Sequence, residues 1–316
     1  MSSARDAERF SRNSNWCYSS SMGKKTGFIG LGVMGFSMAS RLIEAGYELY
    51  LYNRTKSKAG PLVSKGAHWC DSPKEVAEAS DTVFTIVGYP KDVEEVYLGK
   101  NGIIEADISG KIFCDMTTTK PSLDVHIAEK LALKCAEMAD APVSGGDTGA
   151  KNGTLSIMAG CTDDVFEALL PYFEAMGKNI THMGSVGSGQ NTKMANQIVI
   201  AGTMCGVSEA LVYGAKAGLN LEKMVSTISK GAAGCWTLDN LAPRVLKGDY
   251  EPGFMVEHFI KDMGIALDEA EKMELSLPSL ALTKQLYLSI KSQGMGRKGT
   301  QALVKALEAL SGKEIL

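Results

Sequence analysis

The stretch that decides the fold is Gly27-Phe28-Ile29-Gly30-Leu31-Gly32-Val33-Met34-Gly35, which has G-x-G-x-x-G spacing. The first glycine of this pattern, Gly30, permits a tight turn from a strand into a helix. The second, Gly32, lets a pyrophosphate approach the backbone, and the third, Gly35, lets the helix lie close to the strand. Unpaired N–H groups at the start of that helix would bind the diphosphate. The stretch therefore predicts a dinucleotide-binding turn.

The sequence around this stretch contains the strand and helix that such a turn requires. Apolar residues follow Gly35 at helical spacing, and residues 48–52 (ELYLY) form a second strand-like run. The pattern alone is common by chance, so an ordinary glycine-rich turn is the alternative. Its setting between a strand and a helix favours the dinucleotide-binding interpretation.

Length and composition predict a globular protein of about two domains. The chain has 316 residues, of which 45% are hydrophobic, and a formal net charge of −3. It contains no basic stripe, which argues against nucleic acid and anionic membranes as partners. The uncharged apolar stretch 198–207 is shorter than the roughly 20 residues that a membrane span needs. We therefore expect neither nucleic acid nor a membrane as a partner.

Cysteine and histidine usage bears on compartment and metal binding. The seven cysteines are scattered without C-x-x-C spacing, and their odd number argues against a disulfide framework. A reducing, cytoplasmic location is the natural interpretation. The four histidines lie far apart, without the spacing of a metal site. No metal is expected.

The first 21 residues are rich in serine and precede Met22-Gly23. Asp6 and Glu8 do not suit a mitochondrial transit peptide, and the segment lacks the apolar centre of a secretory signal. We interpret residues 1–21 as a disordered leader, an upstream start or a cloning remnant, and exclude them from the fold.

From residue 26 to about residue 183, short β-rich runs alternate with helical ones. Residues 82–87 precede a helical pattern at 90–98, and residues 112–115 precede another at 121–133. This alternation predicts an α/β domain with a parallel, doubly wound sheet of the Rossmann type. Further runs at 155–159 and 180–183 extend the sheet, so the dinucleotide-binding domain should span residues 22–186.

A second, all-α domain is predicted for residues 187–316. After the glycine-rich linker 184–189 the strand signals end, and helical patterns continue to the C-terminus. The first helix should be long, from about residue 190 to 216, because no proline interrupts it. We expect this domain to bind substrate and to mediate dimerisation.

The end of the second strand favours NADP over NAD. A Rossmann domain that binds NAD normally carries an acidic residue there for the ribose 2′-OH, whereas this chain has Asn53-Arg54-Thr55. A guanidinium such as that of Arg54 pairs with a 2′-phosphate, which a carboxylate would repel. The alternative is that Arg54 is an exposed loop arginine. NADP is therefore the predicted cofactor, with NAD possible.

The helix after the linker supplies a candidate acid/base. Gln190, Lys193, Asn196 and Gln197 share one helix face, and the uncharged stretch 198–207 follows them. Lys193 thus stands where the helix becomes buried, and burial there would lower its pKa towards the range useful for proton transfer. An ordinary surface lysine is the alternative.

Four ordered segments of the chain resemble one family, the β-hydroxyacid dehydrogenases. This family includes 3-hydroxyisobutyrate dehydrogenase, tartronate semialdehyde reductase, glyoxylate/succinic semialdehyde reductase and, more distantly, 6-phosphogluconate dehydrogenase. The segments are residues 27–35, 115–121 (DMTTTKP), 140–146 (DAPVSGG) and 187–197 (GSGQNTKMANQ). Residues 254–262 resemble the family's closing motif, so the resemblance extends over essentially everything from residue 24 onward.

The resemblance implies catalytic, cofactor-binding and substrate-binding residues. Lys193 would be the catalytic acid/base, and Asp262 would support Lys261. The cofactor would be bound by Gly30, Leu31, Gly32, Val33, Met34, Gly35, Asn53, Arg54, Thr55, Val87, Gly88, Thr118 and Lys261. Thr118 would contact its nicotinamide end. The substrate carboxylate would be bound by Ser144, Gly145 and Gly146, and the rest of the substrate by Asn196, Gln197 and Trp236. Trp236 follows a glycine-rich turn and is predicted to form part of the substrate wall, with core packing as the alternative.

The departures from the family pattern point to two different substrate classes. Many members have Asn four residues after the lysine, whereas this chain has Gln197 there and Asn196 before it, as tartronate semialdehyde reductases do. The segment Gly234-Cys235-Trp236-Thr237 instead resembles the hydroxyisobutyrate enzymes, and Gly299 replaces a common aspartate.

We therefore expect an NAD(P)-dependent oxidoreductase that interconverts a small 3-hydroxy acid and its semialdehyde. Decarboxylation is not expected, because the chain lacks the length and phosphate-binding surroundings of the 6-phosphogluconate enzyme. The alternative is a catalytically silent, cofactor-binding scaffold, although such relatives replace the lysine that this chain retains. Imine reductases also replace it. The partners should be a small carboxylate and further copies of the chain, in a homodimer or homotetramer.

Overall fold

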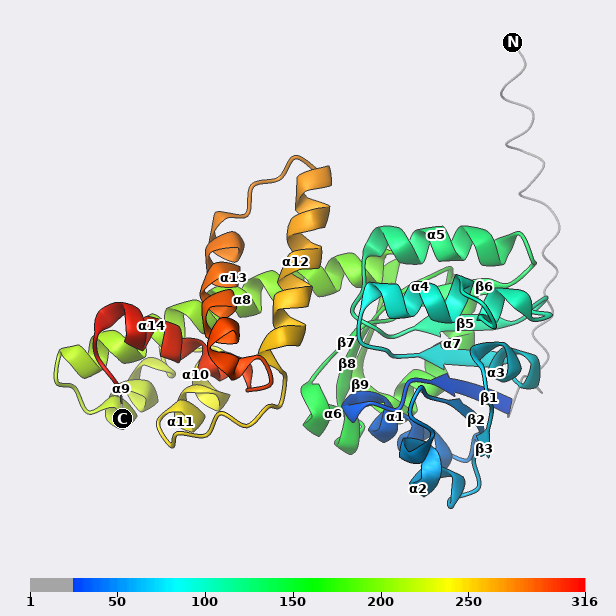
Figure 1. Cartoon of the computed structure of the whole chain (residues 1–316), viewed down its shortest axis with the longest axis horizontal. Coiled ribbons are helices and arrows are strands. Elements are labelled where there is room, and N and C mark those ends of the chain that lie inside the picture. The colour runs from blue at the N-terminus through cyan, green and yellow to red at the C-terminus, as the bar shows by residue number, and fades with distance from the viewer. Residues whose placement is uncertain (1–24, 316) are drawn as a thin grey trace, which may run out of the picture.

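A computed structural model describes residues 25–315 in two parts, an α/β domain and a helical domain. The long helix α8 (Ser188–Lys216) runs from one part into the other (Figure 1). The predicted leader, residues 1–21, lies outside the described residues.

Nine strands form one sheet in the α/β domain, in the order β3-β2-β1-β4-β5-β6-β8-β7, with β9 paired to β8. The pairs from β3 through β6 are parallel, as the sequence predicted. The strands are β1 (Lys25–Ile29), β2 (Glu48–Tyr52), β3 (His68–Trp69), β4 (Thr82–Thr85), β5 (Ile112–Asp115), β6 (Glu137–Asp140), β7 (Val143–Ser144), β8 (Leu155–Gly160) and β9 (Gly177–Gly184).

The prediction of a parallel sheet is wrong at its far end. Strand β8 is antiparallel to both β6 and β7. Only residues 145–154 separate β7 from β8, and a parallel crossover needs about a dozen residues or more. The short helix α6 (Gly146–Asn152) therefore returns the chain in the opposite direction.

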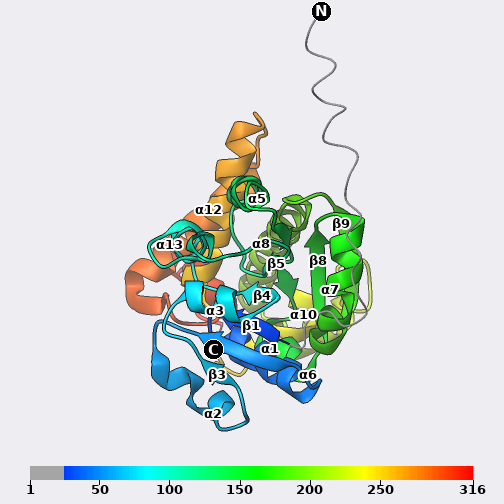
Figure 2. The same ribbon diagram turned by 90° about the vertical axis from the view of Figure 1, so that its right-hand side faces the viewer.

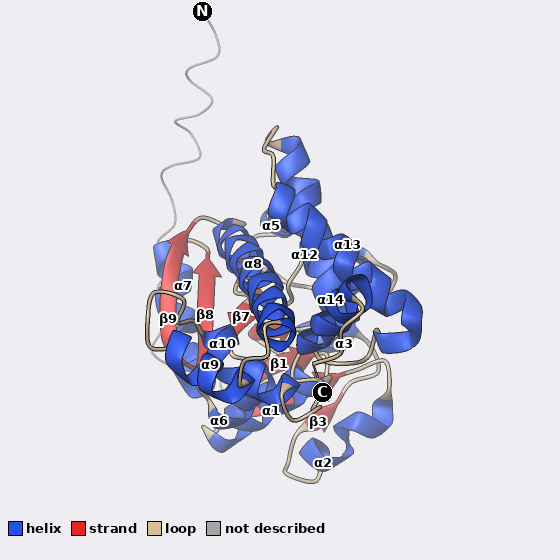
Figure 3. Cartoon of the chain, turned by 90° about the vertical axis from the view of Figure 1, so that its left-hand side faces the viewer, coloured by secondary structure: helices blue, strands red, loops and turns tan. Residues whose placement is uncertain are grey.

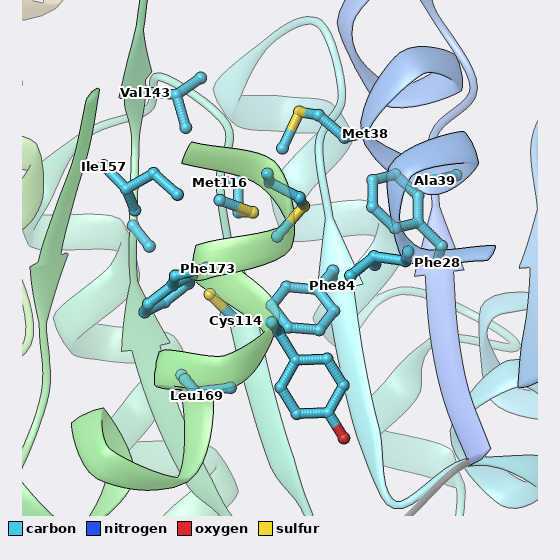
Figure 4. Packing of buried hydrophobic residues seen from close by; sticks show 14 of the residues in the cluster. Phe28, Met38, Ala39, Phe84, Cys114, Met116, Val143, Ile157, Leu169 and Phe173 are labelled. Carbon is cyan, nitrogen blue, oxygen red and sulfur yellow. The ribbon is translucent and has the colours of Figure 1, made fainter. Parts of the chain in front are cut away.

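Helices cover both faces of the sheet, so the domain is doubly wound. They are α1 (Val33–Glu44), α2 (Gly60–Val63), α3 (Pro73–Ala79), α4 (Pro90–Leu98), α5 (Pro121–Ala132), α6 and α7 (Asp163–Met176). On one face Phe28, Phe84 and Cys114 pack against Met38 of α1 and Phe173 of α7 (Figure 4). The alternate residues of these strands pack on the other face, against α3, α4 and α5. Figure 2 shows the sheet between these helices.

The second part is helical, as predicted. Its elements are α8, α9 (Leu221–Ile228), α10 (Trp236–Asn240), α11 (Ala242–Val245), α12 (Val256–Lys272), α13 (Pro278–Ile290) and α14 (Val304–Ser311), with short 3₁₀ and π turns. In the described part of this domain, β pairing is confined to one isolated bridge between Met255 and Gly299 (Figure 3). The apolar side chains of α8, α12, α13 and α14 form its core.

The apolar part of helix α8 is longer than the uncharged stretch 198–207 noted in the sequence. By length and composition alone, this one helix of the described residues could cross a membrane. The buried core helix of a soluble protein meets the same criterion, and Met204 and Leu211 of α8 lie in the core of the helical domain. This finding is therefore weak evidence for a membrane span.

Candidate active site

Two of the three motif glycines are required by the packing of the protein itself. Gly30 has φ +99°, and a Cβ there would lie 2.0 Å from the carbonyl oxygen of Ile86. A Cβ at Gly35 would lie 2.0 Å from the oxygen of Gly30. A Cβ at Gly32 would meet nothing within 4 Å. The middle glycine thus faces open space, which is where a pyrophosphate would approach, and the turn fits a dinucleotide.

The end of β2 is tied to the glycine turn. The Leu31 N–H donates to Oδ1 of Asn53 (2.9 Å), and the Asn53 amide donates to the oxygen of Thr55 (2.9 Å). The exposed Val33 and the half-buried Met34 begin α1 beside them. Asn53 therefore joins the two loops that the sequence assigned to the cofactor.

Arg54 is an exposed side chain that already has a partner. Its side chain is 74% exposed, and its Nη1 lies 3.0 Å from Oδ1 of the buried Asp92 at the start of α4. The guanidinium is therefore held beside the second-strand loop while remaining accessible to an anion. This placement is compatible with both interpretations of Arg54 drawn from the sequence.

Two segments that are distant in the sequence contact the loop formed by residues 117–119. The Val87 N–H, next to the half-buried Gly88, donates to Oγ1 of Thr117 (2.9 Å). Nζ of Lys261, from α12, donates to the oxygen of Thr118 (2.5 Å). The helical domain thus contacts the loop predicted to bind the nicotinamide, and it does so through the lysine that the family resemblance implies.

Lys193 is buried near the start of α8, where the sequence places the acid/base. Its residue is only 6% exposed. Burial lowers the pKa of Lys193 to about 8, the charge of Asp262 opposes this shift, and the charge of Lys261 adds to it. Among residues 25–315, no hydrogen bond or ion pair in the structure engages its Nζ. A lysine in this state exchanges protons readily near neutral pH.

A chain of polar contacts connects α8 to α12 beside Lys193. The Asn196 amide donates to Oε1 of Gln197 (2.8 Å), and the Gln197 amide donates to Oδ2 of the buried Asp262 (2.5 Å). Oδ1 of Asp262 lies 3.0 Å from Nζ of Lys261. The two groups form an ion pair, but their geometry is not that of a hydrogen bond. Gln197 is buried behind Asn196 and orients it, so a direct contact of Gln197 with substrate stays a prediction.

The predicted carboxylate-binding segment follows β7. Ser144 is half-buried and pairs with Ser156 of β8. Gly145 and Gly146 have φ values of +126° and +63°, a conformation in which consecutive N–H groups can form a concave anion site. Strand β8 contacts both β7 and α8, so this segment and the helix that carries Lys193 flank the same strand. No hydrogen bond links Ser144 to Lys193 in the described chain.

Trp236 lies away from Lys193 and is not in the core. It is 66% exposed at the start of α10. Its neighbour Thr237 contacts Thr203 (3.0 Å), which is ten residues beyond Lys193 on α8, or about 15 Å along a helix. The core-packing alternative is therefore wrong, and this chain alone does not bring Trp236 to Lys193.

A hollow in the helical domain lies at the same distant end of α8. It is lined mainly by apolar side chains and glycines, among them Val207, Ile228, Cys235 and Leu238. We place the candidate site at the junction of the domains instead, because the proton-carrying and hydrogen-bonding groups converge there.

The chain resembles known proteins over nearly its whole length. Residues 25–184 match the NAD binding domain of 6-phosphogluconate dehydrogenase, and residues 187–307 match the NAD-binding domain of NADP-dependent 3-hydroxyisobutyrate dehydrogenase. The chain is 52% identical to the probable 3-hydroxyisobutyrate dehydrogenase-like 1, mitochondrial, of Arabidopsis thaliana, over 92% of this chain and 87% of that one. It is 38% identical to the 2-hydroxy-3-oxopropionate reductase of Escherichia coli (strain K12), over 92% of this chain and 99% of that one.

A comparison with solved structures agrees with the comparison of sequences. The structure superimposes on a Mycobacterium tuberculosis 3-hydroxyisobutyrate dehydrogenase with a TM-score of 0.83 at 25% identity, covering 90% of this chain and 98% of that one. The chain belongs to the β-hydroxyacid dehydrogenase family. This β-hydroxyacid dehydrogenase is accordingly an oxidoreductase that uses a nicotinamide cofactor.

Sequence reasoning missed a group of buried carboxylates behind the dehydrogenase site. Asp115, Asp124 and Asp140 are fully buried. Asp140 accepts hydrogen bonds from the N–H groups of Gly187 and Gln190, both at 2.6 Å, and so caps the start of α8. Burial raises the pKa of Asp140 to about 6. The available signal was an aspartate at the end of each of two short strands, β5 and β6.

Proposed function

We propose that the chain interconverts a small 3-hydroxy acid and its semialdehyde, with Lys193 as acid/base. The observation that carries this proposal is a buried lysine, without a hydrogen-bond partner in the described chain, at the junction of the two domains. Burial lowers its pKa to about 8, so both protonation states are accessible under ordinary conditions.

In oxidation, neutral Lys193 accepts the proton of the substrate hydroxyl, and in reduction the ammonium returns that proton to the carbonyl oxygen. A nicotinamide cofactor held at the Gly30–Gly35 turn would accept or supply the hydride. Ser144, Gly145 and Gly146 bind the substrate carboxylate through hydroxyl and N–H donors. Asn196, oriented by Gln197, positions the substrate beside the amine.

Two substrate classes have support. The likeness to 3-hydroxyisobutyrate dehydrogenases favours the branched hydroxy acid, as does the segment around Trp236. The likeness to the E. coli 2-hydroxy-3-oxopropionate reductase favours tartronate semialdehyde, as does Asn196 preceding Gln197. Succinic semialdehyde belongs to the same size class.

We propose NADP as the preferred cofactor, with NAD also accepted, because Arg54 is exposed at the end of β2 and a carboxylate is missing there. Asp92 neutralises part of the Arg54 charge, which moderates the preference. A small carboxylate as substrate, assembly into a homodimer or homotetramer, and a cytoplasmic location complete the proposal.

A catalytically silent scaffold is the competing function. Its support is the glycine turn of the α/β domain, which could bind a dinucleotide without chemistry. Retention of a buried lysine counts against it, because burying an ammonium costs free energy that a scaffold would gain nothing from.

A substrate screen tests the proposal. Purified enzyme is assayed for nicotinamide absorbance changes with 3-hydroxyisobutyrate, tartronate semialdehyde, glyoxylate and succinic semialdehyde, each with NADP(H) and NAD(H). Turnover of 3-hydroxyisobutyrate or tartronate semialdehyde is expected, whereas glyoxylate and succinic semialdehyde give 2- and 4-hydroxy acids on reduction and serve as comparison. Cofactor binding without turnover of any of them would support the scaffold instead.

A further inference from the structure

Gln190 forms two hydrogen bonds with residues 117–119, the loop predicted to bind the nicotinamide. Its side chain is fully buried, one helical turn before Lys193. Its Oε1 accepts from the Thr119 N–H (3.1 Å), and its Nε2 donates to the oxygen of Thr117 (2.6 Å). One carboxamide thus binds the backbone on both sides of Thr118.

The orientation of this carboxamide is fixed. Its Nε2 also donates to Oδ2 of the buried Asp124 (2.9 Å). Rotation of the amide by 180° would place its oxygen against the Thr117 carbonyl and the Asp124 carboxyl group, both of which are acceptors. A fully buried amide cannot compensate such a mismatch with water.

The surrounding acids strengthen this arrangement. Burial raises the pKa of Asp124, and the charges of Asp115 and Asp140 raise it further. When protonated, Asp124 donates a hydrogen bond to Asp115, and this bond raises the pKa of Asp124 further. Asp115 also accepts from the Thr117 N–H (3.1 Å). The acids therefore anchor both the carboxamide and the loop that it contacts.

The helix on which Gln190 stands is fixed as well. Asp140 accepts from the Gly187 and Gln190 N–H groups at the start of α8. Gln190 and Lys193 are three residues apart, so they occupy the same face of α8. Any movement of the Thr118 loop relative to α8 must therefore stretch or break the contacts of Gln190.

We propose that Gln190 is a positioning residue that fixes the Thr118 loop, and with it the nicotinamide end of the cofactor, relative to Lys193. This inference rests on the proposed function, in which Lys193 transfers the proton, and on the predicted contact of Thr118 with the nicotinamide. Gln190 touches neither reacting group and acts through Thr117 and Thr119. Displacement of a reacting group by about 1 Å can lower a rate by about 10²-fold.

The test replaces the carboxamide by a side chain of similar shape that forms no hydrogen bonds. Gln190→Met is compared with Gln301→Met, a matched control. Gln301 is also buried, and its Nε2 also donates to two backbone oxygens, of Asp249 and Glu251, which both belong to the helical domain. Both substitutions remove the same chemical group from the interior of the protein.

The expected result separates positioning from stability. Gln190→Met should lower kcat by about 10- to 100-fold at saturating ligands, with less than about a threefold change in substrate KM. Gln301→Met should lower Tm while kcat stays within about threefold of wild type. Equal effects of the two variants on kcat, or a normal kcat in folded Gln190→Met, would overturn the proposal.

A binding measurement makes the result independent of the substrate. Gln190→Met should weaken NADPH binding, followed by fluorescence, and leave binding of 2′,5′-ADP unchanged, because that fragment lacks the nicotinamide. An unchanged ratio of the two affinities would contradict the proposal. If wild-type enzyme turned over no candidate acid, the proposed function would fail while this ratio still tested the role of Gln190. Should Gln190→Met not fold, Gln190→Asn, whose amide is too short to reach the loop, must change the ratio in the same direction.

Discussion

The amine of Lys193 is the group whose protonation state sets the direction of proton transfer. Burial lowers its pKa from 10.5 to about 8, so the amine is mainly neutral above that pH and mainly charged below it. Oxidation needs the neutral base, and reduction needs the charged acid. We therefore expect kcat/KM for oxidation to rise with pH to a plateau above about 8, and that for reduction to fall above about 8. Profiles without such a transition between pH 6 and 9.5 would contradict this assignment.

Arg54 gives a second prediction for a single side chain. Because its guanidinium is exposed at the end of β2, Arg54→Ala should weaken NADP(H) binding by about 1–3 kcal/mol, as expected for a charge-assisted hydrogen bond. NAD(H) binding should change little. Equal losses for the two cofactors, measured by fluorescence titration, would show that Arg54 does not read the 2′-phosphate.

At the level of elements, the contact between α8 and the sheet depends on one glycine. A Cβ at Gly189 would lie 2.2 Å from the Met158 oxygen and 2.7 Å from the Asp140 oxygen. Gly189→Ala should therefore destabilise the protein by about 1–3 kcal/mol through overpacking. A Cβ at Gly202 on the same helix would meet nothing within 4 Å, so Gly202→Ala should stabilise by about 0.5–1 kcal/mol through helix propensity. Urea unfolding measures both, and equal effects would refute the predicted contact.

Local pattern sufficed for several elements of the α/β domain and for the start of the long helix α8. The helix at 90–98 and the strands at 48–52 and 112–115 have the predicted bounds. Hydrophobic periodicity, and the prolines or glycines that end an element, depend only on neighbouring residues. The antiparallel direction of β8 was missed because it depends on the length of the return through α6. The buried Asp124 and the contacts of Gln190 were missed because they join segments more than 60 residues apart. Lys193 was found because an uncharged stretch follows it directly.

At the level of the whole molecule, the helical domain carries an apolar face that this chain leaves exposed. Val199 and Tyr213 of α8 are 64% and 73% exposed, and they share a face with Gly206 at helical spacing. We expect a second copy of the chain to cover this face. Light scattering after size exclusion should give a dimer or tetramer, and Val199→Glu should dissociate it. A monomer at micromolar concentration would contradict the expectation.

The central claim is that buried Lys193 carries the proton, and Lys193→Met tests it most directly. The variant should lower kcat by about 10²- to 10⁴-fold, the usual contribution of a positioned acid/base. It should not lower Tm at pH 7, because the buried ammonium is destabilising below its folded pKa of about 8 and methionine removes that charge. NADPH affinity should persist, since the Gly30 turn is unchanged. A folded Lys193→Met variant with near-normal turnover would contradict the account.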